Sequence, residues 1–161
     1  MKRCFNCKGR LVRSPNVHVE DVGGVKVTDA TQYALKCEKC GDVFLSAHQL
    51  QEYELRAAAL VLRDGRFVKG AVVRYARHAI GLREFDLAII FDYDTETIYL
   101  WELDAQKVSR RDMLALAGLL DGVREGQSTT RSLLDENDFE KKGSSELQVP
   151  RGIQIETRRQ V

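Results

Sequence analysis

All four cysteines of this chain occur in two C-x-x-C pairs, and this pattern constrains the fold more than any other feature of the sequence. The first pair is Cys4 and Cys7, and the second is Cys37 and Cys40. Two such pairs bring four thiolates within reach of one cation, and a tetrahedral set of four sulfur ligands selects zinc, with iron as the less favoured ion. The spacing therefore predicts one structural Zn²⁺ ion bound by all four cysteines.

Two disulfide bonds are the alternative interpretation of the same cysteines, and they are typical of oxidising compartments. Residues 1–3 lead directly into Cys4 with no apolar signal segment. Apolar runs such as 87–91 are far shorter than the roughly 18 residues that a membrane span needs. We therefore expect a soluble, cytoplasmic protein with no membrane partner, and we favour metal over disulfides.

The segment between the cysteine pairs has the alternation of β-strands. Three short strands are predicted over 17–20, 25–28 and 33–36, the first two joined by a glycine turn. Three strands and four sulfur ligands outline a zinc ribbon over residues 1–45, which is too small to fold without the metal. His18 falls on the polar phase of its strand, so we expect a solvated side chain rather than a fifth ligand.

Helical spacing replaces strand alternation after the ribbon. Ser46 and Gln49 form a capping-box pattern, which predicts a helix from Ser46 to Leu62 that is broken by residues 63–66. We interpret 46–67 as a linker helix and linker between two halves of the chain.

The spacing over 68–123 predicts a compact bundle of four or five helices. A helix that ends at Gly81, a second helix, and a third that opens at Asp94 as N-cap are typical of a helix-turn-helix. Ile98 and Trp101, three residues apart, are expected to anchor the third helix in the core.

The predicted fold class is α+β: a small zinc ribbon of three strands, an all-α helix-turn-helix bundle, and a largely irregular C-terminal tail over 124–161. The tail is poor in apolar residues and rich in glycine, serine and acids, which is typical of sequence that cannot bury a core. The alternating runs 147–149 and 153–157 leave open the hypothesis of a short β-arm.

The order of these motifs resembles the MqsA (YgiT) family of zinc-ribbon antitoxins and regulators with a Cro/XRE-type helix-turn-helix. The resemblance rests on the C-x-x-C pairs, on the R-x-x-x-G-L motif at 77–82 and on the T-I-x-x-W-E motif at 97–102, and it covers roughly residues 1–123. It implies a cytoplasmic repressor that dimerises through its C-terminal half and binds palindromic operator DNA. It also makes a ribonuclease toxin a candidate partner of the zinc domain.

Carried onto this sequence, the helix-turn-helix implies a set of DNA contacts. Glu96 is suited to accept a hydrogen bond from a cytosine amine, Leu100 to cover a thymine methyl group, and Thr95 to serve either base. The predicted DNA-binding residues are Arg83, Thr95, Glu96, Thr97, Tyr99, Leu100, Lys107, Arg110 and Arg111.

Charge argues against that assignment. The whole chain has a formal net charge of +1, and the segment 69–123 has seven basic residues against nine acidic ones. Because DNA affinity comes largely from basic groups on phosphates, an alternative is a zinc-ribbon adaptor whose helix-turn-helix docks a protein and no longer binds DNA. Dimerisation is expected through the apolar residues of the last bundle helix, Leu114, Leu116, Leu119 and Leu120.

An enzymatic function is not expected. The three histidines lie in separate elements, and the sequence has no H-E-x-x-H, G-x-S-x-G or phosphate-binding glycine motif. A site closed by four sulfur ligands leaves no open coordination position for a substrate.

Overall fold

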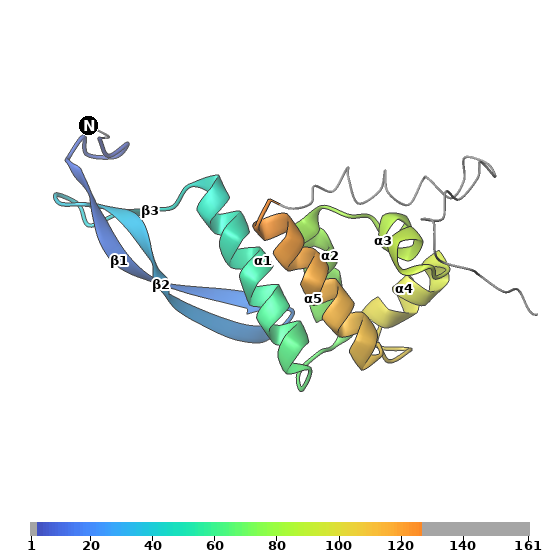
Figure 1. The fold of residues 1–161 in the computed structure, drawn as a ribbon. Coiled ribbons are helices and arrows are strands. Elements are labelled where there is room, and N and C mark those ends of the chain that lie inside the picture. The colour runs from blue at the N-terminus through green and yellow to red at the C-terminus, as the bar shows by residue number, and fades with distance from the viewer. Residues whose placement is uncertain (1–2, 127–161) are drawn as a thin grey trace, which may run out of the picture.

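A long β-hairpin and five helices make up the α+β fold of this chain (Figure 1). The computed structural model describes residues 3–126, with the backbone alone at 31–32. The elements in order are β1 (Leu11–Val22), β2 (Val25–Cys37), β3 (Val43–Phe44), α1 (Ala47–Asp64), α2 (Gly70–Ile80), α3 (Glu84–Phe91), α4 (Thr95–Glu102) and α5 (Arg110–Arg124). The predicted tail and β-arm lie almost entirely outside the described residues.

The sheet is antiparallel, in the order β1-β2-β3. β1 and β2 pair from Leu11 opposite Cys37 to Val22 opposite Val25, with an irregularity in register between Asn16 and His18. The predicted strands 25–28 and 33–36 are therefore not separate strands. Both are parts of the single 13-residue strand β2. The third strand, β3, follows the second cysteine pair and has only two residues.

The two faces of the hairpin also differ from the expectation. Val17 and Val19 are exposed, whereas His18 is half-buried. The His18 ring stacks on Tyr53 of α1, with 4.3 Å between ring centroids, and its Nε2 lies 2.9 Å from a carboxylate oxygen of Glu20. The prediction of a solvated His18 is wrong, because α1 covers the polar phase of β1 and supplies an aromatic partner.

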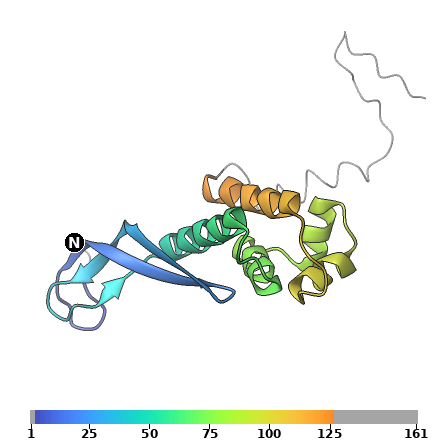
Figure 2. The ribbon, with the colours of Figure 1, turned by 90° about the horizontal axis from the view of Figure 1, so that it is seen from below.

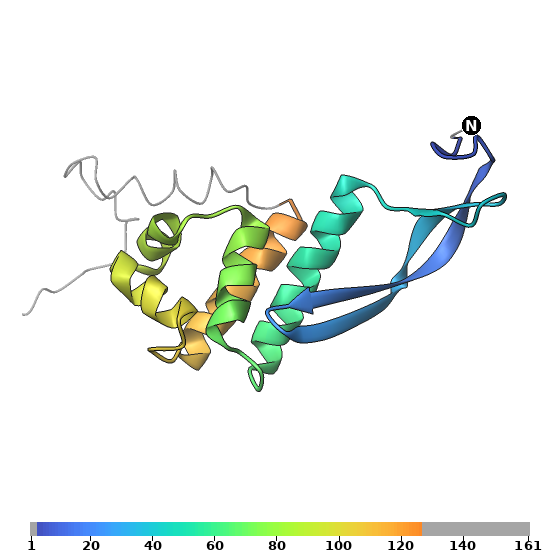
Figure 3. The same ribbon diagram turned by 180° about the vertical axis from the view of Figure 1, so that it is seen from behind.

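Helix α1 packs against other elements on two of its sides, whereas it was expected to be a linker helix between the two halves of the chain. Its capping box is confirmed, since the Ser46 hydroxyl accepts from the Gln49 backbone N–H and the Gln49 side chain accepts from the Ser46 N–H. The hairpin crosses one side of α1, and α2 and α5 lie along the other (Figures 2 and 3). Leu55, Ala58 and Leu62 are consequently buried, so α1 belongs to the helical core.

The tip of the hairpin joins the same core. Val22 is fully buried among residues of the helices. Gly23 has φ +57°, and a Cβ there would lie 2.5 Å from the carbonyl carbon of Ala71 in α2. Glycine is required at this position by both the left-handed backbone and the close approach of α2.

Two helix ends in the segment 68–123 lie where the sequence predicts. Gly81 ends α2 in the left-handed conformation, and Asp94 is the N-cap of α4. Ile98 is fully buried and Trp101 nearly so, as predicted. Within the described residues, no helix is long and apolar enough to cross a membrane.

The proposed dimerisation residues of α5 divide into two groups. Leu116 and Leu120 are buried in the core of this chain, so they are not free to meet a second subunit. Leu114 is 46% exposed and Leu119 is half-buried. The expectation that all four leucines form an interface is therefore wrong for the two that face α1 and α2.

Candidate functional site

The four predicted ligands meet at the end of the hairpin far from the helices. Their sulfur atoms all lie within 4.8 Å of one another. Cys4 Sγ is 3.6 Å from Cys40 Sγ, and Cys7 Sγ is 3.4 Å from Cys37 Sγ. A tetrahedral zinc site with Zn–S bonds of about 2.3 Å has sulfur atoms about 3.8 Å apart, whereas a disulfide needs about 2.05 Å. The geometry therefore fits a metal ion, and all four cysteines are free of disulfides.

Two turns of the same design hold these sulfur atoms. In the first, the Cys4 N–H donates to the Gly9 carbonyl and the Lys8 N–H to the Cys4 carbonyl; in the second, Cys37 donates to Asp42 and Gly41 to Cys37. The fifth residue of each turn has a positive φ, +58° at Lys8 and +79° at Gly41. Matching turns present the two pairs of sulfur atoms to each other in equivalent orientations.

Small size is required beside the cluster. A Cβ at Gly9 would lie 2.9 Å from Cys37 Sγ and 3.2 Å from Cys7 Sγ. Any larger residue at this position would displace ligand atoms, so the glycine allows the backbone to approach the sulfur cluster.

Neighbouring backbone N–H groups favour the thiolate form of Cys37 in particular. The backbone N–H of Cys40, and that of Lys39 at 3.4 Å from Sγ, lower the pKa of Cys37 to about 6 against the opposing effect of burial. At Cys40 the Asp42 N–H lowers the pKa, but the Asp42 carboxylate, desolvation and the neighbouring thiols together raise it. Asp42 in turn accepts from the Asn6 amide at 2.8 Å, which lowers its own pKa.

Burial also differs among the four ligands. Cys4 and Cys37 are buried, Cys7 is half-buried and Cys40 is exposed. When a divalent ion is bound, the buried pair would anchor it inside the turns, while Cys40 is the ligand open to solvent. Among the described residues, the group of side chains that could bind one ion consists of four sulfur donors without a carboxylate or imidazole, which is the donor set of a structural metal site rather than a catalytic one.

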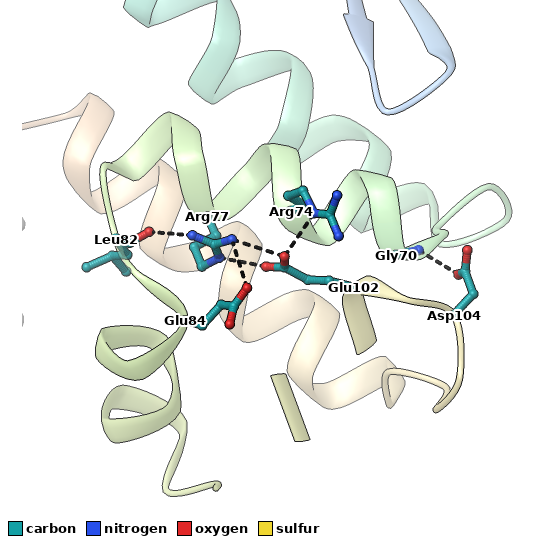
Figure 4. Close-up of polar contacts among 7 residues, drawn as sticks. All are labelled: Gly70, Arg74, Arg77, Leu82, Glu84, Glu102 and Asp104. Carbon is teal, nitrogen blue, oxygen red and sulfur yellow. Dashed lines mark hydrogen bonds and ion pairs between the residues drawn. The ribbon is translucent and has the colours of Figure 1, made fainter. Parts of the chain in front are cut away.

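A buried ion pair joins α4 to α2 within the helical region (Figure 4). Arg77 donates from Nε to Glu102 Oε1 at 2.6 Å and from Nη2 to Oε2 at 3.0 Å, and its Nη1 donates to the Leu82 carbonyl at 2.9 Å. Arg74 donates to Glu102 Oε2 at 3.0 Å. Glu102 is 4% exposed, so its two oxygen atoms are held almost entirely by arginines.

The predicted DNA-contact residues of α4 and of the segment that follows it differ in their exposure. Thr95, Glu96 and Tyr99 are exposed on α4, whereas Thr97 and Leu100 are half-buried. Lys107 is exposed in the segment between α4 and α5.

The three arginines of that set have partners within the chain. Arg83 donates to both oxygens of Asp86 at 2.8 Å, and Arg111 Nε lies 3.5 Å from Asp112. Arg110 donates to the backbone carbonyls of Leu62 and Arg63, at the C-terminus of α1. Arg110 is therefore a helix cap in this structure, and capping explains its presence without a nucleic acid.

Sequence reasoning missed two groups of residues. Asn6 and Asp42 support the cysteine cluster, and the position of Asp42 two residues after Cys40 is the signal that would have suggested it. Arg77 and Glu102 entered the sequence analysis only as parts of motifs; the available sign of a buried pair was that each lies four residues after a buried apolar residue of its helix, Val73 and Ile98 respectively.

Comparisons of the chain with protein-family models, with curated proteins and with solved structures found no significant match.

Proposed function

We propose that this chain is a zinc-stabilised transcriptional regulator of the antitoxin type that binds operator DNA as a dimer. The observation that carries the proposal is the arrangement of α3 and α4. The short turn 92–94 joins the two helices, with Asp92 in the left-handed conformation at φ +56°. A three-residue turn between two short packed helices is typical of a helix-turn-helix.

The exposed face of α4 supports its assignment as the recognition helix. Thr95, Glu96 and Tyr99 share one face of the helix, and all three are exposed. Ile98 and Trp101 hold the opposite face in the core. Threonine and glutamate offer the hydrogen-bonding groups that distinguish base pairs in the major groove.

The metal centre supports the zinc-ribbon part of the proposal. The ribbon would comprise the two cysteine turns and the adjoining ends of β1, β2 and β3, with Zn²⁺ at Cys4, Cys7, Cys37 and Cys40. Its role is structural, because four thiolates complete the coordination of zinc. By the family resemblance, this ribbon is also where a toxin partner would bind.

A second candidate function, a protein adaptor, is favoured by the ion pairs described above. Arg83 is neutralised by Asp86, and Arg110 caps α1, so fewer positive charges are available to phosphates than the sequence suggests. In this alternative, α4 would contact a protein and the chain would show no salt-dependent affinity for DNA.

The test is the affinity of the metal-loaded protein for a duplex from upstream of its own gene, measured by fluorescence anisotropy over a range of salt. Tyr99→Ala and Glu96→Ala should each weaken binding by about tenfold, since a good base contact contributes about 1–3 kcal/mol. Phe67→Ala is the matched control, because Phe67 is a similarly exposed aromatic outside α4.

Three outcomes separate the hypotheses. Sedimentation equilibrium should show a dimer that binds the duplex. Affinity that is insensitive to salt and to Tyr99→Ala would contradict operator binding. Co-purification with the product of the adjacent gene, without a DNA shift, would instead support the adaptor.

A further inference from the structure

One face of the sheet at the metal end is uncovered and carries aromatic side chains. The register places Arg13 opposite Leu35, and Leu35 opposite Phe44 of β3. Directly paired residues share a face, and residues two apart on one strand do so as well, so Tyr33 lies on this face with Leu35. Phe5 adds a further ring, 6.1 Å from that of Phe44. We call Phe5, Arg13, Tyr33, Leu35 and Phe44 the outer sheet face.

The opposite face of the hairpin is the one that α1 covers. His18 and Glu20, which contact Tyr53 and Tyr75, alternate along β1 with the exposed Val17 and Val19. Arg13 has the same parity along β1 as these valines. The outer sheet face therefore points away from α1, and none of the helices of residues 3–126 covers it (Figure 3).

Two aromatic rings of this face are strongly exposed. Phe5 is 78% exposed and Tyr33 is 45% exposed. The Arg13 guanidinium lies over the Tyr33 ring, 4.3 Å from its centroid. Exposed rings next to a planar guanidinium form a surface on which flat heterocycles can stack.

Positive charge is concentrated around the same face. Residues 3–16 and 33–45 contain six basic side chains, all exposed, against the acids Glu38 and Asp42; the basic ones are Arg3, Lys8, Arg10, Arg13, Lys36 and Lys39. Lys36 lies on the other face, since it pairs with Val12 and Val43. A divalent ion with four thiolates contributes two negative charges, and the metal end remains net positive with it bound.

We propose that the outer sheet face binds single-stranded nucleic acid. Unstacked bases would lie on Phe5, on Tyr33 and on the Arg13 guanidinium, and the basic side chains of the cysteine turns would contact phosphates. A duplex is excluded from this mode, because its bases are stacked on one another and offer no free π-face. The site is separate from α4 and does not depend on the operator-binding proposal.

Charge favours nucleic acid over the other occupants of an apolar sheet face. A second copy of this chain would bring a second net-positive surface against the first. An acidic protein would satisfy the charges, but it would not need two exposed rings beside a guanidinium. An acidic polypeptide, poly-glutamate, is therefore included as a competitor in the test.

The experiment measures the binding of fluorescent oligo(U) and oligo(dT), each of about 12 nucleotides, to full-length, metal-loaded protein at low salt. Phe5→Ala and Tyr33→Ala should each weaken binding at least about fivefold, and Arg13→Gln should reduce the salt dependence. Phe67→Ala is the matched control, because its ring is 55% exposed and lies under Arg66 in a similar cation–π pair. Binding by this variant should equal that of the wild type.

Unchanged metal content and circular dichroism must accompany each loss, and the high exposure of Phe5 makes its removal harmless to folding. The proposal is overturned if the single strands do not bind, if Phe5→Ala and Tyr33→Ala bind normally, or if Tyr99→Ala abolishes the binding. The proposal is also overturned if poly-glutamate, at an equal concentration of charge, displaces the oligonucleotide. That result would mean that the site recognises negative charge alone and not the bases.

Discussion

The metal end and the helical region are stabilised in opposite ways. At the metal end, over residues 3–16 and 33–44, the buried residues are Cys4, Ala34 and Cys37, two of which belong to the cysteine cluster. The helical region buries a continuous apolar cluster contributed by α1 to α5, and the hairpin tip adds Val22 to it. One β-hairpin thus has a tip held by hydrophobic packing and an open end held by four sulfur atoms.

The boundary between the region held by the cysteine cluster and the region held by apolar packing lies within the hairpin. The strands β1 and β2 are paired all the way from the cysteine cluster to the helical core. Their register shifts at one place, between Asn16 and His18. Loss of metal should accordingly unfold only part of the hairpin, because burial of the tip does not depend on the cysteines.

The largest expected effect is that of Cys37→Ser. Removal of a buried ligand should abolish stoichiometric metal binding, which in zinc-finger peptides contributes about 10–16 kcal/mol of apparent free energy. Hydrogen exchange should then show loss of protection at 3–16 and 33–44, with α1 to α5 still protected. Asn6→Ala is the control, because it removes only a bond to Asp42. Simultaneous loss of protection in the helices would contradict the division of the hairpin.

A smaller effect is expected from Glu102→Leu, which leaves Arg77 buried without its carboxylate. Breaking one partner of a buried ion pair costs about 3–5 kcal/mol of unfolding free energy. The double variant Arg77→Met/Glu102→Leu should recover most of that loss, as measured by denaturant unfolding. If the single and the double variant are equally destabilised, the pair does not explain the packing of α4 on α2.

Low pH should weaken the interaction of Glu102 with Arg77 and Arg74. Burial opposes the charged form of Glu102, but hydrogen bonds and charge from Arg77 and Arg74 outweigh it and hold the pKa below its usual value. A carboxylate with a lowered pKa in the folded state stabilises the protein fully above its unfolded pKa of about 4.5, and this contribution is lost as the pH falls through the folded pKa. The unfolding free energy of the wild type should therefore decline below about pH 4.5 more steeply than that of Glu102→Leu.

Gly23→Ala tests the junction at the hairpin tip. The added Cβ would overlap the backbone of α2, and overpacking of this kind costs about 1–3 kcal/mol. Gly24→Ala is a matched control, since Gly24 also has a positive φ, +91°, but has open space at the Cβ position. Equal unfolding free energies for the two variants would show that the tip does not pack on α2 in solution.

The smallest effect is expected at the cysteine turns. Lys8 occupies the left-handed conformation that Gly41 occupies in the second turn. Non-glycine residues are disfavoured there by about 1 kcal/mol, so Gly41→Ala should weaken metal retention against a chelator and Lys8→Gly should strengthen it slightly. Opposite signs for the two variants are the diagnostic result; equal signs would contradict the equivalence of the turns.

Local patterns in the sequence were sufficient to predict the four-cysteine cluster and several helix ends. Cys4, Cys7, Cys37 and Cys40 were predicted because the spacing alone brings them together, and the structure places their sulfur atoms in one cluster. The capping pattern at Ser46 and the glycine at Gly81 were equally reliable, since a cap depends on backbone atoms a few residues away.

Features that depend on distant partners were predicted poorly. His18 was expected in solvent because its own strand offered no reason to bury it, and the reason is Tyr53, which lies 35 positions further along the sequence. Leu116 and Leu120 were expected at a dimer interface, because a helical stripe of leucines has the same appearance whether it meets the core or another subunit.

The pairing of the four cysteines, the α+β order of elements and the caps follow from short-range spacing and backbone chemistry, so they could be derived from the sequence alone. The tertiary structure was needed to show that α1 is a core helix, that the hairpin tip packs on α2, and that Arg110 and Arg77 have partners inside the chain. Burial and ion pairing depend on which surfaces meet, and residues far apart in the chain supply those surfaces.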